Sequence, residues 1–364
     1  MIDSLYVHIP FCKSICYYCD FCHVVYNEKM VDDYLDALEK DLNFHVKNRN
    51  LKTIYIGGGT PTCLNEEQLE KLLQMLRYFS RFVKEYTIEI NPETMSEAKY
   101  QLLAKYGINR ASIGLQSTND DILKFMNRKH DFNDVKKVID KLHQYHIDNI
   151  SIDLMYSIPN QTLKNFRDSL NEVCKLDIDH VSIYSLTIEE NTVFGKKGYT
   201  PLDEETEADM YDMAKKILKQ NGFKQYEISN FAKDGHESQH NIAYWNYDDY
   251  YGVGAGASGK EGYIRYDVTR NILDYIDDYE TREEIHLSDE DLMFENVMMS
   301  LRMVQGLDLK LFAKRYDISF QRRYGDVVDD LVKQKLLVIE KDHVHCSEYG
   351  LDICNSVIEE FLAI

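Results

Sequence analysis

Four cysteines lie within eleven residues near the start of the chain. Cys12, Cys16 and Cys19 form a C-x3-C-x2-C pattern, and Cys22 follows three residues later. Three thiolates at this tight spacing can hold three irons of a [4Fe-4S] cluster and leave the fourth iron without a protein ligand. Because an open iron can bind a reactant, the spacing indicates a cluster that takes part in chemistry.

A structural zinc site is the alternative interpretation of this segment, because Cys16, Cys19 and Cys22 contain two overlapping C-x2-C steps. Structural zinc sites usually take their ligands from two separated pairs, since one tight loop has difficulty surrounding a tetrahedral ion. A redox-active dithiol is a third interpretation. Spacing favours the cluster over both, and it leaves Cys22 without an assigned role.

A second motif, Gly57-Gly58-Gly59-Thr60-Pro61, follows a short β-branched run and precedes a predicted helix start at Asn65. Glycines at such a position let backbone groups approach a ligand closely. Asn65 and Gln68 have the spacing of a capping box. A phosphate-binding P-loop is excluded because no Gly-Lys-Ser/Thr follows the glycines.

The elements that must position these motifs alternate along the chain. Repeated strand and helix patterns of this kind build a parallel sheet. The strands are predicted at 5–9, 53–56, 86–90, 110–115, 149–154 and 181–186, and the helices at 29–46, 66–79, 96–106, 133–145, 163–175 and 204–221. Six units predict an α/β fold, a partial (β/α)6 barrel of the TIM type. Function in such barrels collects in the loops after the strands, where the cysteines and glycines fall.

The pattern changes after residue 235, which we take as the end of a barrel domain at 1–235. Residues 236–287 form a segment rich in His, aromatic and Gly residues that ends in an acidic linker. Residues 288–364 show helical runs and a hairpin turning at Lys341-Asp342, typical of a small winged-helix-like α/β domain. That domain has nine Lys and Arg against fifteen Asp and Glu, a balance that disfavours DNA binding.

Composition excludes several classes of partner. The chain carries 62 acidic and 42 basic residues, a net charge of -20, so no overall field attracts nucleic acid or an anionic membrane. Neither a signal-peptide pattern nor an apolar run of about 18 residues is present. We expect a cytoplasmic protein with no nucleic-acid partner and no membrane insertion. In that reducing compartment, the eight cysteines are expected to be thiols or metal ligands.

The cysteine pattern, with Tyr18 directly before the third cysteine, resembles the radical S-adenosylmethionine (SAM) superfamily. The resemblance implies a [4Fe-4S] cluster on Cys12, Cys16 and Cys19, SAM chelated to the open iron, and an electron donor for the cluster. The residues that match SAM contacts of the family are Tyr6, Tyr18, Gly58, Gly59, Thr60, Glu89, Gln116, Arg128 and Asp153. Without the resemblance, these would be interpreted as strand-end or surface residues, and Arg128 as half of an exposed ion pair.

Longer strings resemble the anaerobic coproporphyrinogen III dehydrogenase group and its relative, the HemW group of haem chaperones. They include Tyr6-Val-His-Ile-Pro-Phe-Cys12, Tyr226-Glu-Ile-Ser-Asn230 and Leu301-Arg-Met-Val-Gln305. The chain starts at its first strand without the additional segment of the dehydrogenases, and Phe21 stands where they have a cysteine. Both features favour a chaperone that binds haem and passes it to an acceptor protein. The alternative is an oxygen-independent coproporphyrinogen III oxidase, so whether the protein is an enzyme stays open.

The string His240-Asn-Ile-Ala-Tyr244-Trp245 resembles the HNxxYW motif attributed to haem binding in the chaperone group. Imidazole is a common axial ligand of haem iron, and the aromatic rings of Tyr244 and Trp245 could face the flat macrocycle. We therefore expect His240 to ligate the haem iron, with His236 as the second candidate. Without the resemblance, one histidine among twelve is usually structural.

Overall fold

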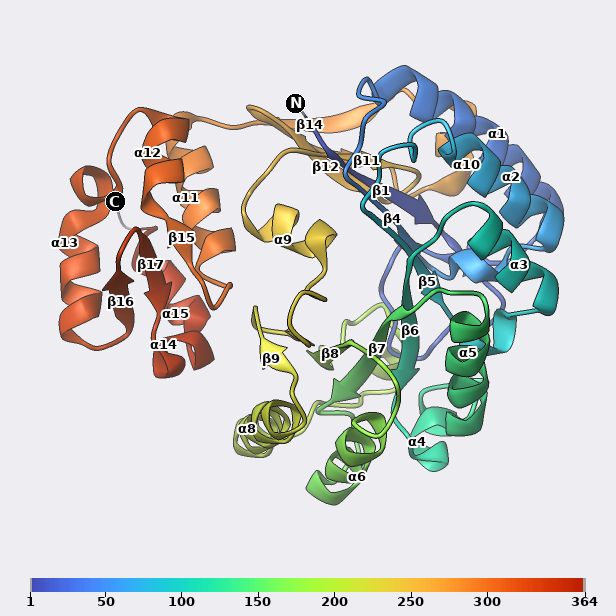
Figure 1. Ribbon diagram of the computed structural model, residues 1–364, viewed down its shortest axis with the longest axis horizontal. Coiled ribbons are helices and arrows are strands. Elements are labelled where there is room, and N and C mark those ends of the chain that lie inside the picture. Colours follow the sequence, from blue (N-terminus) through green and yellow to red (C-terminus); the bar gives the residue numbers. More distant parts are fainter. Residues whose placement is uncertain (1, 363–364) are drawn as a thin grey trace.

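The computed structural model describes residues 2–362. Its centre is a curved sheet of twelve strands whose outer face is covered by helices (Figure 1). The strand order is β14-β13-β12-β11-β1-β4-β5-β6-β7-β8-β10-β9, so that β14 and β9 are edges and the barrel is not closed. This arrangement confirms the predicted partial barrel.

All six predicted strand and helix units are present. The strands, parallel and adjacent in the sheet, are β1 (Ser4–Ile9), β4 (Thr53–Gly58), β5 (Glu85–Ile90), β6 (Arg110–Gln116), β7 (Asn149–Tyr156) and β8 (His180–Ser185). The helices are α1 (Glu28–His45), α2 (Glu66–Leu76), α3 (Glu97–Lys105), α5 (Phe132–Gln144), α6 (Leu163–Val173) and α8 (Glu204–Gln220). Short elements between them are β2 (Phe11–Cys12), β3 (Val24–Val25), η1 (Pro61–Cys63), η2 (Pro92–Thr94), α4 (Asp120–Phe125), α7 (Val193–Lys196), β9 (Lys224–Gln225) and β10 (Asn230–Ala232).

Local sequence explains where the long helices begin. A side-chain oxygen caps the backbone N–H groups of the first turn in each of the six, and this lowers the cost of starting the helix. The capping residues are Asn27, Asn65, Ser96, Asp131, Thr162 and Asp203. The capping box predicted for Asn65 and Gln68 is confirmed.

The segment 236–287, expected to lie outside the barrel, instead continues the main sheet. It contributes α9 (Gln239–Trp245), β11 (Tyr250–Val253), β12 (Ser258–Glu261), β13 (Ile264–Val268), α10 (Ile272–Asp277) and β14 (Arg282–His286). Strand β11 pairs in parallel with β1, and the next three strands add antiparallel. The acidic residues that suggested a linker lie on α10, in the turn after it and on β14, an edge strand, where charged residues protect against further pairing. We therefore place the end of the barrel domain near residue 287.

A buried carboxylate, Asp41 of α1, ties this added segment to the barrel. Its oxygens accept hydrogen bonds from the backbone N–H of Gly254 (3.1 Å), the hydroxyl of Tyr275 (2.8 Å) and the guanidinium of Arg282 (3.1 Å). The side chains of Asp41 and Arg282 are 0% and 6% exposed. Because water does not screen this pair, its geometry matters to stability.

Replacing Asp41 with alanine is expected to lower the free energy of unfolding by about 3 kcal/mol, because the buried Arg282 would keep only the more distant carboxylate of Glu261, 3.9 Å away. Urea unfolding followed by circular dichroism measures this change. Asp36→Ala is the matched control, since Asp36 lies on the same helix with its side chain 64% exposed. Its loss should stay below about 1 kcal/mol, and equal losses for the two variants would contradict the role of Asp41.

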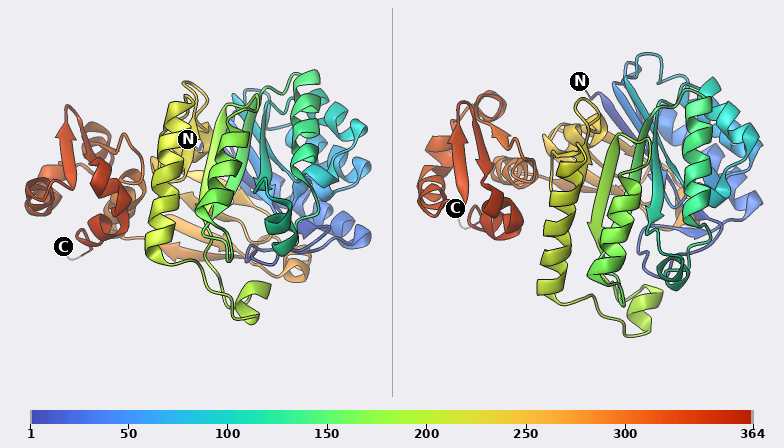
Figure 2. Two further views of the ribbon diagram at one scale, coloured as in Figure 1. Left: turned by 90° about the horizontal axis from the view of Figure 1, so that it is seen from below. Right: turned by 60° about the horizontal axis from the view of Figure 1, so that its bottom comes forward.

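The C-terminal part forms a separate small domain with its own core (Figure 2). Its elements are α11 (Asp289–Ser300), β15 (Leu307–Asp308), α12 (Leu309–Tyr316), α13 (Phe320–Lys333), β16 (Leu337–Glu340), β17 (His343–Cys346), α14 (Glu348–Asp352) and α15 (Cys354–Glu359). The hairpin turns where predicted, with Lys341 in the left-handed region at φ 54°, and Ile353 separates the two short helices α14 and α15. Within residues 2–362 no helix is long and apolar enough to span a membrane.

Candidate functional site

The inner face of the parallel sheet is polar. Side chains alternate along each strand, and the outward set, such as Ile56, Ile88 and Ile152, is buried in the apolar core. The inward set consists of Tyr6, Tyr55, Glu85, Glu89, Arg110, Ser112, Ser151, Asp153, His180, Ser182 and Tyr184. A TIM-barrel interior is ordinarily filled with branched apolar side chains, so this one is suited to a polar ligand. The signal was in the sequence, because buried parallel strands are usually apolar throughout and these alternate.

The three cysteines of the predicted cluster lie in the loop between β1 and α1. Cys12 is buried, whereas Cys16 and Cys19 are partly exposed. The Sγ of Cys12 lies 3.5 Å from the Thr60 hydroxyl, and the Sγ of Cys16 accepts a hydrogen bond of 3.5 Å from the Arg128 guanidinium. Burial raises the pKa of Cys12 to about 11 and that of Cys19 to about 12. The thiol form is thus favoured at Cys12 and Cys19 in the metal-free loop, and iron binding would release the thiol protons.

Cys22 has a different environment, which accounts for its presence. Its thiol donates a hydrogen bond of 3.2 Å to the carbonyl of Arg270. A Cβ added to Gly256 would lie 2.4 Å from the Cβ of Cys22, so the glycine loop packs directly against this side chain. Cys22 therefore packs as a structural thiol.

The glycine motif after β4 positions the carboxylate of Glu89. That carboxylate accepts hydrogen bonds from the backbone N–H of Gly58 (3.1 Å) and the hydroxyl of Tyr55 (3.0 Å). A Cβ on Gly57 would lie 2.8 Å from the carboxylate, and one on Gly58, whose φ is 118°, would lie 2.8 Å from the His8 ring. Burial, with Asp153 nearby, raises the pKa of Glu89 to about 7. The site thus places a carboxylate that titrates near neutral pH beside a stretch of backbone without side chains.

Three polar side chains converge above Gly114, at a bulge in β6. A Cβ added there would lie 3.1–3.3 Å from atoms of Gln116, Arg128 and Asn91. Arg128 donates to the side-chain oxygen of Asn91 (2.8 Å) and to the carbonyl of Gly114 (2.5 Å). It is buried, and so differs from an exposed ion pair. Asn91, which also donates to Thr60 (2.8 Å), was missed, although the Asn-Pro pair after β5 marks its position.

The other residues predicted to contact SAM lie on the same side of the sheet. Asp153 on β7 accepts a hydrogen bond of 3.2 Å from Ser112. Tyr6 on β1 shares a hydrogen bond of 2.9 Å with His8. Tyr18 packs in a small apolar cluster with Met126. The structure therefore gathers these groups around the cysteine loop from strands β1 to β7.

His240 lies away from the cysteine loop, at the N-terminal ends of the strands. Its Nδ1 is 2.9 Å from the hydroxyl of Thr53, the first residue of β4, and its ring centroid is 5.3 Å from that of Tyr55. Glu85 accepts hydrogen bonds from the backbone N–H groups of Gln239 (2.8 Å) and His240 (2.9 Å), which fix the start of α9. Burial lowers the pKa of His240 to about 3, so its imidazole is neutral. Helix α9 lies between the sheet and the C-terminal domain (Figure 1).

The other predicted haem residues have separate surroundings. Tyr244 is 41% exposed. Trp245 packs with Leu292 and Met299 of the C-terminal domain. His236 lies 3.5 Å from the carboxylate of Asp179. The rings of Tyr244 and Trp245 contact each other, with centroids 5.5 Å apart, whereas His240 packs against Tyr55 of β4 and His236 lies beside Asp179.

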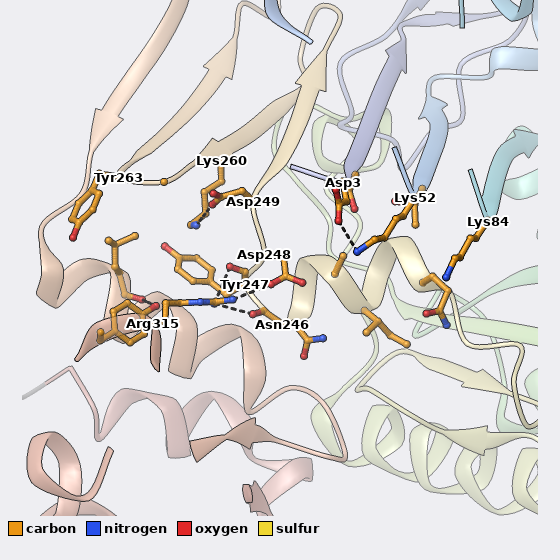
Figure 3. A pocket seen from close by; sticks show the side chains of 18 residues that line it. Asp3, Lys52, Lys84, Asn246, Tyr247, Asp248, Asp249, Lys260, Tyr263 and Arg315 are labelled. Atoms are coloured by element: carbon orange, nitrogen blue, oxygen red, sulfur yellow. Dashed lines mark hydrogen bonds and ion pairs between the residues drawn. The ribbon is translucent and has the colours of Figure 1, made fainter. Parts of the chain in front are cut away.

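A cavity of about 660 Å³ lies beside α9, bounded by strand ends and by the C-terminal domain (Figure 3). Its cations are mostly paired with acidic neighbours. The pairs are Lys52 with Asp3 (2.6 Å), Lys260 with Asp249 (2.5 Å) and Arg315 with Asp248 (2.9 Å). The charges in this cavity are thus largely balanced, and the cavity was not predicted.

An open parallel barrel that gathers a C-x3-C-x2-C loop, a glycine turn and inward carboxylates defines the radical SAM class. Residues 6–173 match the radical SAM superfamily, and residues 287–353 match the HemN C-terminal domain. The chain belongs to the HemW family within this class. It is 37% identical to haem chaperone HemW of Lactococcus lactis over 99% of this chain and 97% of that protein. The corresponding protein of Bacillus subtilis is 38% identical over 99% of both chains.

The fold is also that of a solved structure. Coproporphyrinogen III oxidase (HemN) from Escherichia coli superposes with a TM-score of 0.85, covering 98% of this chain and 89% of that one, at 24% sequence identity. Membership of the radical SAM superfamily implies a [4Fe-4S] cluster and SAM as cofactors. The cysteine loop offers the soft thiolate donors that such a cluster requires.

Proposed function

We propose that the protein is a cytoplasmic haem chaperone, which carries a [4Fe-4S] cluster with SAM and passes haem to an acceptor protein. The observation that carries this proposal is the similarity to proteins named haem chaperone HemW, which extends over 99% of the chain. The inward polar face of the barrel adds support, because it provides a surface for a ligand that carries charged groups. An electron donor for the cluster is a further partner in this proposal.

Within this function, Cys12, Cys16 and Cys19 would hold the cluster, which when bound can supply an electron to SAM. Other residues of the protein would bind SAM and orient the cysteine ligands. Glu89, held by Gly58, is suited to the amino group of SAM, since a carboxylate pairs with an ammonium. Arg128 donates to the sulfur of Cys16 and so helps to orient that side chain.

Haem ligation by His240 draws support from the state of its ring. The imidazole is neutral, which is the form that ligates iron. Its Nδ1 contacts Thr53, while its Nε2 has no hydrogen-bond partner among residues 2–362. When one ring nitrogen of a histidine is held by a hydrogen bond, the tautomer is fixed and the other nitrogen can ligate a metal. His240 thus offers one orientated free nitrogen at the base of the barrel.

Titration of the purified protein with haemin should produce a Soret band, and His240→Ala should weaken binding by about 10-fold or more because an axial ligand is lost. His236→Ala is the matched control, expected to leave binding unchanged. Absence of a haem spectrum with the wild type would overturn the proposal. Sustained decarboxylation of coproporphyrinogen III by the anaerobic, SAM-loaded protein would favour the oxidase instead.

A further inference from the structure

One buried side chain inside the barrel has a charge without a partner. Arg110, the first residue of β6, is 2% exposed. Its guanidinium makes no hydrogen bond and no ion pair with any residue between 2 and 362, and its Nε is completely shut off from solvent. A buried guanidinium ordinarily requires both a counter-charge and hydrogen bonds, because it has lost its hydration.

Two other buried arginines show what the fold provides when the role is structural. Arg282, 6% exposed, is paired with the carboxylate of Asp41 at 3.1 Å. Arg128 donates to Asn91, to a backbone carbonyl and to the sulfur of Cys16. Arg110 has no equivalent, although it sits on the same polar face. Arg128 and Arg282 also leave their Nε without a partner. Arg110 differs from them in that its terminal nitrogens have no hydrogen-bond partner either among residues 2–362.

The groups around Arg110 do not neutralise it. His180 is fully buried and hydrogen-bonded to Ser151 (2.7 Å) and to the hydroxyl of Tyr226 (2.9 Å). Burial, and secondly the positive charge of Arg110, lower the pKa of His180 and of His240, so both rings are neutral. Neither ring therefore supplies a counter-charge, and the register partners of Arg110 on the two neighbouring strands, Thr87 and Asn149, are uncharged.

The acidic side chains of the interior are already engaged. Glu85 accepts two backbone N–H groups of α9 and the hydroxyl of Ser238 (3.2 Å). Asp153 accepts from Ser112, and Glu89 from Gly58 and Tyr55. None of them lies within ion-pair distance of Arg110 in the described part of the chain. The positive charge of Arg110 partly offsets the raised pKa of Asp153, but no carboxylate forms an ion pair with Arg110 among residues 2–362. The place of a direct partner for Arg110 is therefore open to a molecule that enters the barrel.

We propose that Arg110 binds a carboxylate of the ligand held inside the barrel. This inference rests on the proposed function, in which the ligand is haem and the carboxylate is one of its propionates. A guanidinium matches a carboxylate with two parallel hydrogen bonds. Arg110 lies six residues before Gln116 on β6, about 20 Å along the strand. Arg110 therefore lies at the opposite end of this strand from the cysteine rim.

The test compares haemin with haemin dimethyl ester, which has the same macrocycle but no free carboxylate. The wild type is expected to bind the ester about 10- to 100-fold more weakly, because the charged hydrogen bonds to Arg110 are lost. Arg110→Gln should weaken haemin binding by a similar factor and bind the two compounds equally. Arg110→Lys keeps a cation without the guanidinium fork and should retain part of the preference.

Thermal unfolding of the ligand-free protein separates binding from structure. Arg110→Gln should leave the unfolding midpoint unchanged or raise it, because an unpaired buried charge is removed. Arg282→Gln is the matched control, expected to lower the midpoint and to keep the preference for haemin over its ester. A lowered midpoint for Arg110→Gln with unchanged haemin binding would overturn the inference and assign Arg110 a structural role.

The outcomes distinguish this inference from the function on which it rests. A wild type that binds neither compound would overturn both. A wild type that binds haemin and its ester equally would overturn the role of a carboxylate and leave the chaperone function standing. If Arg110→Gln fails to fold, the wild-type comparison and Arg110→Lys still decide.

Discussion

Alanine at Cys12, Cys16 or Cys19 is expected to abolish the iron–sulfur cluster, whereas Cys22→Ala should retain about four irons per chain. The cluster needs three thiolates at once, so each single loss removes an indispensable ligand. Cys22 lies in the same loop, but its thiol donates to the carbonyl of Arg270 and packs against Gly256. It is therefore a control matched in chemistry and in sequence position.

The measurement is anaerobic reconstitution with iron and sulfide, followed by iron and sulfide analysis and the visible spectrum of the cluster. Reconstitution with zinc in place of iron and sulfide should not give this spectrum. Full cluster content in Cys16→Ala, or its loss in Cys22→Ala alone, would contradict the assignment. Either result would move the fourth cysteine into the ligand set.

Glu89→Gln is expected to weaken SAM binding by about 100-fold, because the amide cannot pair with the ammonium group of SAM. The wild type should also show a pH dependence that the variant lacks. Burial holds the pKa of Glu89 at about 7, so the carboxyl is protonated in the free protein at lower pH. Since SAM binds the ionised form, affinity should fall roughly tenfold per pH unit below 7 and level off above it.

Equilibrium dialysis of reconstituted protein with labelled SAM between pH 6 and 8 measures both effects. Glu93→Gln is the control, because Glu93 follows the same strand but lies 3.4 Å from the ring of His130 and outside the glycine turn. It should keep the affinity and the pH profile of the wild type. A wild-type affinity that does not change with pH would show that Glu89 is not the titrating partner of SAM.

The six strand and helix units could be predicted closely from the sequence. The strand predicted at 149–154 is β7, Asn149–Tyr156, and the helix predicted at 204–221 is α8, Glu204–Gln220. These signals are local, since each unit carries its own periodicity and its own cap. The fold of 236–287 could not be predicted in this way. Strand β11 pairs with β1, joining Tyr250 to Ser4 across most of the barrel sequence, and its glycines and charges hide the strand pattern.

The surroundings of single residues could not be predicted from local sequence patterns either. Sequence resemblance grouped His240 with Tyr244 and Trp245, but the structure directs the first against β4, exposes the second and packs the third against the C-terminal domain. Successive positions on one helix face different neighbours. Which neighbour each side chain meets depends on elements far away in the sequence.

By itself, the sequence determined which cofactor-binding motifs this protein carries. The spacing of Cys12, Cys16 and Cys19 and the glycines before Thr60 are local features whose chemistry depends on a few adjacent residues. Only the tertiary structure decided that Cys22 is a packing residue and that Arg110 is a buried cation without a partner. The reason is physical: hydration and pairing of a side chain depend on what surrounds it, and strands brought together from distant parts of the chain supply those surroundings.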